Sequence, residues 1–230
     1  MERVKARGAR WIVTTMVLAI AFAAAAIGGG APARAASEVN VATLATGDLT
    51  GYAAAPPAVQ RLIARALALT TQNLAYNYGS SDPASGGMDC SGTVYYLLND
   101  AGLKDVPRDA SGMYRWVWTQ SRFYAVNSVN PATFEFDALR PGDLLFWTGT
   151  YDVQRDPPVT HVMIYLGVSR LTGRRVMAGA SEGRRFNDVS RYGVSVFDLE
   201  LPRPRAAGDA GTSRFIGYGP VPGLVPSQVR

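Results

Sequence analysis

The stretch GGMDCSGTVYYLLNDAG, residues 86–102, predicts a helix that begins beside the only cysteine of the chain. Asp89 is a suitable N-cap, which places Cys90 in the first turn, and Gly102 is a natural stop. Free backbone N–H groups and the helix dipole stabilise negative charge at that end, so the position favours a thiolate. The apolar residues that recur at helical spacing are Val94, Leu97, Leu98 and Ala101.

Cys90 and His161 are the only cysteine and the only histidine among the 230 residues. Taken alone, such a cysteine is more often a small buried hydrophobe, and such a histidine is more often structural. A cysteine nucleophile needs a base within hydrogen-bond reach, however, and one imidazole is available. The same counts exclude a Cys/His zinc site, and no G-x-S-x-G nucleophile elbow occurs. The residue counts therefore favour a Cys90–His161 pair.

Residues 1–35 have the features of a secretory signal peptide. A basic MERVKARGAR segment precedes the apolar run WIVTTMVLAIAFAAAAIG, and Ala33-Arg34-Ala35 forms an A-x-A cleavage pattern. The alternative is a membrane anchor, because a run of about 18 residues could just span a bilayer. The alanine-rich run and the adjoining cleavage pattern favour removal. We therefore predict a protein that is secreted, or held in the periplasm or cell wall, without a membrane anchor after cleavage.

The composition is that of a globular protein with one sizeable domain, with 47% hydrophobic and 18% charged residues. The nominal net charge of +5 comes from 23 basic and 18 acidic residues. Five of the basic residues and one acidic residue lie in residues 1–35, so the remainder carries only +1. This balance gives no case for a nucleic-acid partner. An exported lone cysteine is a candidate reactive thiol, because it cannot form an internal disulfide.

The pattern predicts helices first and strands afterwards. A second helix is expected from residue 58, behind a Pro-Pro start, with apolar residues at helical spacing. Strands are expected at 143–147 and in THVMIYLGV, residues 160–168, which is rich in β-branched and aromatic residues. Weaker strands are expected near 174–178, 193–198 and 213–218. This order favours an α+β fold.

Small, polar residues flank this region on both sides. We predict a loose N-terminal arm at 36–57, one domain at 58–218 and a C-terminal tail at 219–230.

Five short segments follow one another along the predicted domain: Tyr76-Asn77-Tyr78-Gly79, MDCSG, VPRDAS, RPGDLLFW and HVMIYLG. In this order they resemble the signature of NlpC-type papain-like peptidases, which are bacterial cell-wall cysteine hydrolases. The combination is specific, whereas each segment alone is weak. The resemblance implies an α+β fold of the papain-like NlpC type, in which a nucleophile-bearing helix packs on an antiparallel sheet that carries the histidine.

The resemblance also implies a set of site residues. Cys90 would be the nucleophile, His161 the general base, and Tyr76 would lie beside the nucleophile. Asp89 and Ser91 would help to hold the free amine of a peptidoglycan stem peptide. The family cuts amide bonds in such stems, commonly between D-Glu and the diamino acid. The chemistry needs no metal and no cofactor, and we expect a monomer.

One position departs from the family pattern. A third polar residue usually follows the base, about one strand later, and orients the imidazole. Aligning RRVMAGASEG with that strand puts Ala178 there. Ser181, Glu182 or a backbone carbonyl could substitute. If none does, the departure favours a catalytically impaired wall-binding module of the same fold. A separate alternative is a papain-like amidase or acyltransferase with a non-wall substrate, and a groove that admits a free α-amine beside Asp89 would count against it.

Overall fold

The computed structural model describes residues 39–201 and 213–225. The predicted signal peptide at 1–35 and the last residues of the predicted tail, 226–230, lie outside the described residues. The chain divides into two units, Met1–Arg34 and Ala35–Arg230, and the described residues all belong to the second. No helix within 39–201 or 213–225 is long and apolar enough to cross a bilayer.

Three α-helices form where the sequence supplies a start signal and an apolar face. Helix α1 spans Pro57–Thr70 and has proline in its first turn. Helix α2, Cys90–Asp100, is capped by Asp89, whose carboxylate accepts from the Gly92 N–H. Helix α3, Ala110–Gln120, was not expected from the sequence, and Asp109 caps it. Single 3₁₀ turns are η1 Thr46–Asp48, η2 Pro83–Ser85 and η3 Phe134–Phe136.

An antiparallel sheet of seven strands lies behind the helices, with the order β4-β9-β5-β6-β7-β8 and with β1 paired to β6. Its strands are β1 Leu49–Thr50, β4 Tyr124–Ala125, β5 Leu144–Thr148, β6 Val159–Ser169, β7 Arg175–Phe186, β8 Val189–Asp198 and β9 Arg214–Gly219. A separate parallel pair joins β2 Ala75–Tyr76 to β3 Gly87–Met88. The predicted α+β fold is confirmed, and β7 and β8 are longer than expected.

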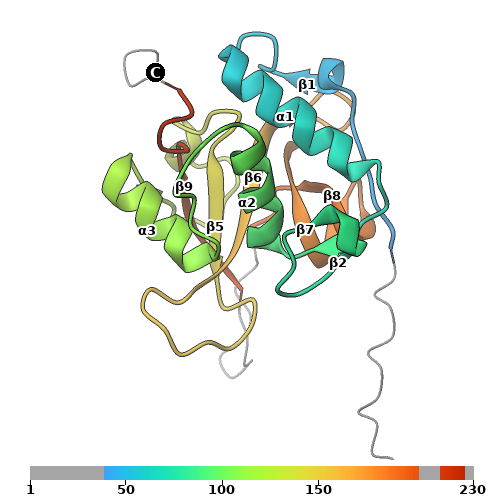
Figure 1. The fold of residues 1–230 in the computed structure, drawn as a ribbon. Helices are drawn as coiled ribbons and strands as arrows, with labels where there is room; N and C mark the ends of the chain where they lie inside the picture. The colour runs from blue at the N-terminus through green and yellow to red at the C-terminus, as the bar shows by residue number, and fades with distance from the viewer. Residues whose placement is uncertain (1–38, 202–212, 226–230) are drawn as a thin grey trace, which may run out of the picture. The chain divides into compact units, whose positions relative to one another are not determined.

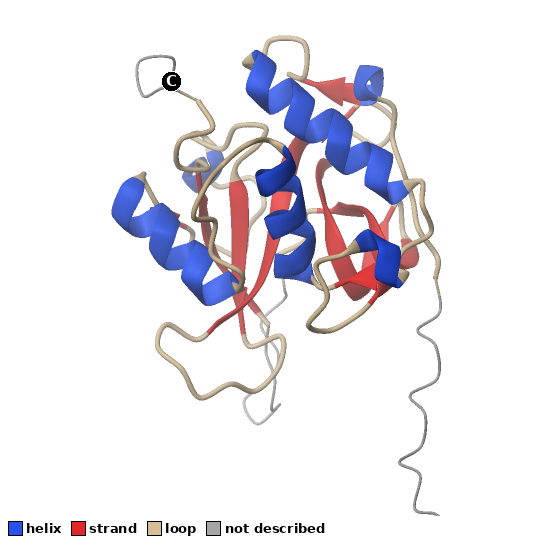
Figure 2. Cartoon of the chain, in the orientation of Figure 1, coloured by secondary structure: helices blue, strands red, loops and turns tan. Residues whose placement is uncertain are grey.

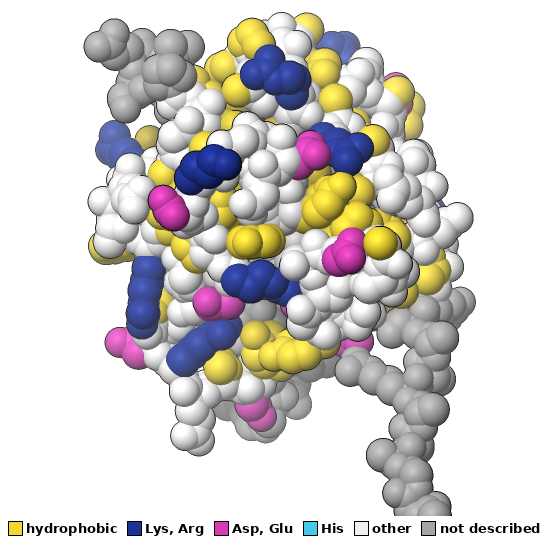
Figure 3. All heavy atoms as spheres, in the orientation of Figure 1, with side chains coloured by type: hydrophobic (Ala, Val, Ile, Leu, Met, Phe, Trp, Pro, Cys, Tyr) yellow, Lys and Arg dark blue, Asp and Glu magenta, His cyan; other side chains and the backbone are white. Residues whose placement is uncertain are grey.

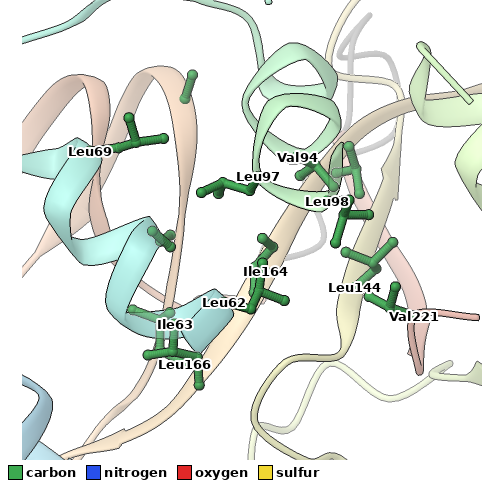
Figure 4. Packing of buried hydrophobic residues seen from close by; sticks show 14 of the residues in the cluster. Leu62, Ile63, Leu69, Val94, Leu97, Leu98, Leu144, Ile164, Leu166 and Val221 are labelled. Carbon is green, nitrogen blue, oxygen red and sulfur yellow. The ribbon is translucent and has the colours of Figure 1, made fainter. Parts of the chain in front are cut away.

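The three helices lie on one side of the sheet (Figures 1 and 2). The apolar core between them and the strands draws Leu62 and Ile63 from α1, Leu97 from α2, and Leu144 and Ile164 from β5 and β6 (Figure 4). All five side chains are at most 1% exposed. Burial of such side chains from several elements holds α2 against the sheet.

A second apolar cluster lies on the other face of the strands. Because side chains alternate along a strand, Met163 and Tyr165 of β6 belong to this cluster, whereas Val162 and Ile164 belong to the first. Trp147 of β5 is also in the second cluster. The sheet is therefore buried on both faces, and each strand residue can be assigned to one of them.

The segments predicted as arm and tail pack on the domain where they are described. Asn40 forms a bridge with Tyr192 of β8, and the Val196 N–H donates to the Ala42 carbonyl. At the other end, Val221 and Leu224 are buried in the first cluster. Both segments thus differ from the expectation, because the open edge of β8 accepts one and the core accepts the other.

Candidate active site

The Cys90 thiol lies against the backbone of β6 on both sides of His161. Its Sγ donates to the Thr160 carbonyl at 3.9 Å, and the backbone of Val162 also hydrogen-bonds to the thiol group. Cys90 is 5% exposed and His161 is 6% exposed. Packing of α2 on the sheet thus brings together the two residues that the sequence pairs.

His161 lies on the sheet face of the second cluster. It pairs with Trp147 across β5 and β6, and the two rings meet edge to face with centroids 5.5 Å apart. The His161 Nε2 is buried and has no hydrogen-bond partner among the described residues. The thiol therefore lies against the backbone that flanks His161, and no hydrogen bond joins Sγ to Nε2. Such contacts are often poorly aligned in enzymes without substrate.

Both groups rest in their neutral forms at neutral pH. Burial raises the pKa of the Cys90 thiol to about 11, with a further contribution from the Asp89 carboxylate. Burial also lowers the pKa of His161 well below its usual value, and the positive charge of Arg184 adds to this. The backbone N–H groups at the helix start act in the expected direction, but desolvation outweighs them. The structure therefore favours a thiol–imidazole pair over the thiolate expected from the helix start.

We expect alkylation of resting Cys90 by iodoacetamide to be slow at pH 7 and to rise steeply above about pH 9. The thiolate is the reactive form, and a raised pKa leaves it scarce until the pH approaches about 11. Mass spectrometry after timed quenching measures the rate, and labelling is unambiguous because the chain has one cysteine. Fast, pH-independent labelling below pH 7 would contradict a neutral resting pair.

Tyr76 reaches the nucleophile through the short parallel pair of strands. The β2–β3 register places Tyr76 opposite Met88, two residues before Cys90. Burial raises the pKa of its hydroxyl above the usual value, and the Asp89 carboxylate and the ionised form of Cys90 act in the same direction. The hydroxyl therefore stays protonated and can donate a hydrogen bond beside the thiol.

Asp89 and Ser91, which the family resemblance assigns to a substrate amine, are both bound by Arg108. The guanidinium lies 3.0 Å from the Asp89 carboxylate and 3.1 Å from Ser91 Oγ, and it donates to the Gly79 carbonyl at 2.9 Å. The Gly79 N–H in turn donates to Asp89 at 2.8 Å. One cation therefore joins the helix start, the preceding loop and the VPRDAS segment.

Comparison with known proteins agrees with this arrangement. The sequence model of the NlpC/P60 family matches residues 73–196, which make up more than half of the chain and include Cys90 and His161. The chain belongs to the NlpC/P60 family. Murein DD-endopeptidase MepH of Escherichia coli (strain K12) is 33% identical over 92 residues, 40% of this chain and 28% of that protein.

A solved structure from the same family is also similar to this NlpC/P60 chain. It is a protein of Staphylococcus aureus subsp. aureus Mu50 described as similar to lipoprotein, with a TM-score of 0.45 and 24% identity. The match covers 73% of this chain and 42% of that one. The matched regions therefore span less than half of either relative.

The third position of this NlpC/P60 domain is not where the sequence alignment placed it. Ala178 pairs with Ile164, is 2% exposed and lies in the first cluster, on the face opposite to His161. Because side chains alternate along β7, Ser181 lies on the face opposite to Ala178, which is the face of His161. Ser181 is buried, and Glu182 acts electrostatically on Tyr76. Ala178 is therefore excluded as the position of an orienting side chain, whereas Ser181 and Glu182 stay predictions.

We expect Ala178→His to destabilise the protein by about 2–4 kcal/mol without raising kcat/KM. The imidazole would enter a packed apolar core, which combines overpacking with burial of a polar ring. Thermal melts and hydrolysis rates measure the two effects. Ala178→Val is the matched control, because it adds volume without a polar atom. A gain in kcat/KM at unchanged stability would show that this position does reach His161.

The sequence reasoning missed two arginines and one tyrosine at this NlpC/P60 site. Arg108 lies in the quoted VPRDAS segment, so its charge beside DCSG was the available signal. Tyr151 of the β5–β6 loop acts electrostatically on Cys90 and meets the exposed Tyr78 edge to face at 6.3 Å. Arg184 of β7 acts electrostatically on both Cys90 and His161. No local pattern marks the last two.

Proposed function

We propose that this protein is a secreted cysteine peptidase that hydrolyses an amide bond in peptidoglycan stem peptides, between D-Glu and the diamino acid. The observation that carries the proposal is the Cys90 thiol at the start of α2, seated against the β6 backbone on both sides of His161. Membership of the NlpC/P60 family supports the cell-wall substrate, and the relative MepH is named a murein DD-endopeptidase.

The proposed reaction begins with transfer of the Cys90 proton to His161, because both groups rest neutral. The thiolate attacks the amide carbonyl, and the imidazolium then protonates the leaving amine. In this reaction the Cys90 backbone N–H and the protonated Tyr76 hydroxyl would stabilise the oxyanion. Water, deprotonated by His161, attacks the thioester and restores the enzyme.

The contacts of Arg108 affect whether the site can bind the free amino terminus of the stem peptide. A free amine would need an unpaired carboxylate, whereas Asp89 already has a guanidinium at 3.0 Å. We therefore propose that Asp89 and Ser91 hold the helix start and its loop together, and that cleavage does not depend on a free amino terminus. This role replaces the amine-binding role that the resemblance implies for the two residues.

Digestion of purified muropeptides tests the proposed function directly. Mass spectrometry should find new termini at the D-Glu to diamino acid bond, with no added metal or cofactor. A synthetic stem whose amino terminus is acetylated should be cleaved at a similar rate, because Asp89 is already paired. Strong preference for the free amine would restore the amine-binding role of Asp89, and intact muropeptides would contradict the proposed peptidase.

The catalytically impaired wall-binding module is the second candidate, because Nε2 of His161 has no partner among the described residues. It predicts that the protein binds muropeptides and leaves them intact. The face in Figure 3 shows basic and acidic side chains interspersed, so this face has no single-sign surface that would favour generic adsorption to an anionic polymer.

The proposed function also includes export of the protein from the cell. We propose that residues 1–35 are removed on secretion and that the mature protein acts as a monomer outside the cytoplasm. Support comes from the sequence pattern of residues 1–35, which the structure does not describe.

A further inference from the structure

Arg184 of β7 is a partly buried cation beside the candidate catalytic pair. Its guanidinium lies over the Trp147 ring, 4.4 Å from the centroid, and Trp147 in turn contacts His161. The Arg184 side chain makes no hydrogen bond or ion pair with any residue in 39–201 or 213–225. Trp147 below it is buried, and its Nε1–H has no acceptor among the same residues. Two neighbouring donors thus lack an acceptor.

A β-bulge turns Arg184 toward this site. The β7–β8 register shifts between Ser181 and Arg184, so that three steps along β7 oppose two along β8, from Gly193 to Arg191. Without the extra residue, alternation would put Arg184 on the face opposite to Ser181. The bulge restores it to the face of Trp147, and bulges commonly re-aim side chains next to active sites.

The other arginines of the same hairpin have polar partners, so the isolation of Arg184 is specific. Arg175 donates to the Pro131 carbonyl at 2.7 Å, and Arg174, just before β7, lies 3.0 Å from both Asp188 and Asp198. Arg185 donates to the Asp188 carbonyl at 2.6 Å, and Arg191 donates to Asn40 at 2.9 Å. Structural arginines on this hairpin are therefore paired within the protein, whereas Arg184 has donors available for a ligand.

We infer that Arg184 binds the free carboxylate of the residue whose carbonyl carbon Cys90 attacks, which makes it a specificity-determining residue. This inference rests on the proposed function. Glutamate has two carboxyl groups, and the scissile amide uses one of them. The other remains on the same residue, a few bonds from the carbonyl carbon. A guanidinium is the side chain best suited to bind such a group by paired hydrogen bonds.

The electrostatics of the site agree with a carboxylate ligand. Burial lowers the pKa of Arg184 to about 10, and the negative forms of Cys90 and Glu200 oppose this shift. The guanidinium is therefore charged at neutral pH while its desolvation is poorly compensated. Glu200 is exposed and forms no ion pair with it. A bound carboxylate would supply the missing counter-charge and would also offset the effect of Arg184 on His161.

The test combines changes at Arg184 with a change of the substrate carboxyl group, as in a double-mutant cycle. Two synthetic stem peptides differ only at the free glutamyl carboxyl, which is a carboxylate in one and a carboxamide in the other. We measure kcat/KM of wild type, Arg184→Gln, Arg184→Lys and Arg185→Gln on both. Arg185→Gln is the matched control, because it makes the same change one residue along, where the side chain is exposed. Thermal melts exclude unfolding.

We expect Arg184→Gln to lose about 10- to 100-fold in kcat/KM on the carboxylate peptide, the size of a charge-assisted hydrogen bond. On the carboxamide peptide it should lose less than about 3-fold, and Arg184→Lys should recover part of the difference. Arg185→Gln should match wild type on both peptides. Equal loss on the two peptides would mean that Arg184 positions His161 instead, and no loss would mean that it does neither.

Either of those results would overturn the inference while leaving the peptidase function intact. If wild type cleaves neither peptide, the proposed bond is wrong, and the specificity assigned to Arg184 falls with it. The two failures are therefore distinguishable in one experiment.

Discussion

Cys90→Ala should abolish release of stem fragments while the protein keeps its fold. Alanine suits the first turn of a helix, and the change removes one sulfur atom from a site that is 5% exposed. Loss of a nucleophile that acts within a catalytic unit lowers kcat by on the order of 10⁴-fold or more. Mass spectrometry of muropeptide digests measures the rate, and a thermal melt within a few degrees of wild type confirms the fold.

His161→Ala should cost nearly as much, on the order of 10³-fold or more in kcat. Because the thiol rests protonated, a base has to remove its proton before each attack. The double variant should be no slower than Cys90→Ala, since members of one unit fail together. The chain has no second cysteine or histidine that could substitute. Fragment release by Cys90→Ala would point to a different nucleophile and would contradict the assignment.

The helices and strands that the sequence predicts correctly are those with a strong local pattern. Helix α2 combines an N-cap, apolar residues at helical spacing and a glycine stop in one stretch. Strand β6 is a long run of β-branched and aromatic residues. Helix α3 was missed because ASGMYRWVWTQ mixes glycine, serine and aromatic residues of modest helix propensity. Its signal was Asp109, which accepts from the N–H groups of Ser111 and Gly112.

The site was predictable only as far as its residues lie in short motifs. Cys90, Asp89 and His161 each lie in such a motif, and the structure brings these segments together. The position of Arg184 depends on a bulge in a strand that pairs with two others, which no local pattern encodes. Ala178 also shows that a local sequence pattern does not determine which residues meet across the sheet. Alignment of a short glycine-rich run gave Ala178 as the third position, but this residue lies on the sheet face opposite to His161.

The predictions of a loose arm and a tail relied on the composition of each segment, which does not include the contacts that the segment makes with the rest of the domain. Small and polar residues lack the apolar surface to fold independently, but they can still pair with an open strand edge. Here Ala42 accepts from Val196 and donates to Ser195 Oγ, so the edge of β8 orders the segment. Leu44 is buried by the same contacts.

Gly92→Ala should be strongly damaging, although Gly92 lies inside a helix. In an open helix position this change stabilises by up to about 1 kcal/mol. A Cβ at Gly92, however, would lie 2.9 Å from the Ser80 carbonyl carbon and from Asp89 Oδ1, and closer still to the Ser80 oxygen. That oxygen accepts from the Asp89 N–H at 3.0 Å, so the loop cannot move away without breaking this hydrogen bond to the N-cap residue of α2.

We expect Gly92→Ala to destabilise the protein by about 2–4 kcal/mol, because a backbone carbonyl gives way less easily than a side chain. For a domain of this size the melting temperature should fall by about 5–12 °C. Hydrolysis should fall by more than about 10-fold, because the displaced loop carries Gly79, which anchors Arg108 and Asp89. Differential scanning calorimetry and muropeptide digestion measure the two losses.

Gly47→Ala is the matched control, because a Cβ there meets nothing within 4 Å. Its stability should stay within about 0.5 kcal/mol of wild type. At an exposed helix position Gly→Ala raises stability, whereas at Gly92 we expect it to lower stability. The sign of the stability change therefore separates a clash with the Ser80 carbonyl from an effect of helix propensity. Suppose instead that Gly92→Ala melts at or above the wild-type temperature and keeps its activity. The loop at Ser80 then does not fix the helix start, and the position of Cys90 depends on the packing of α2 against β6 alone.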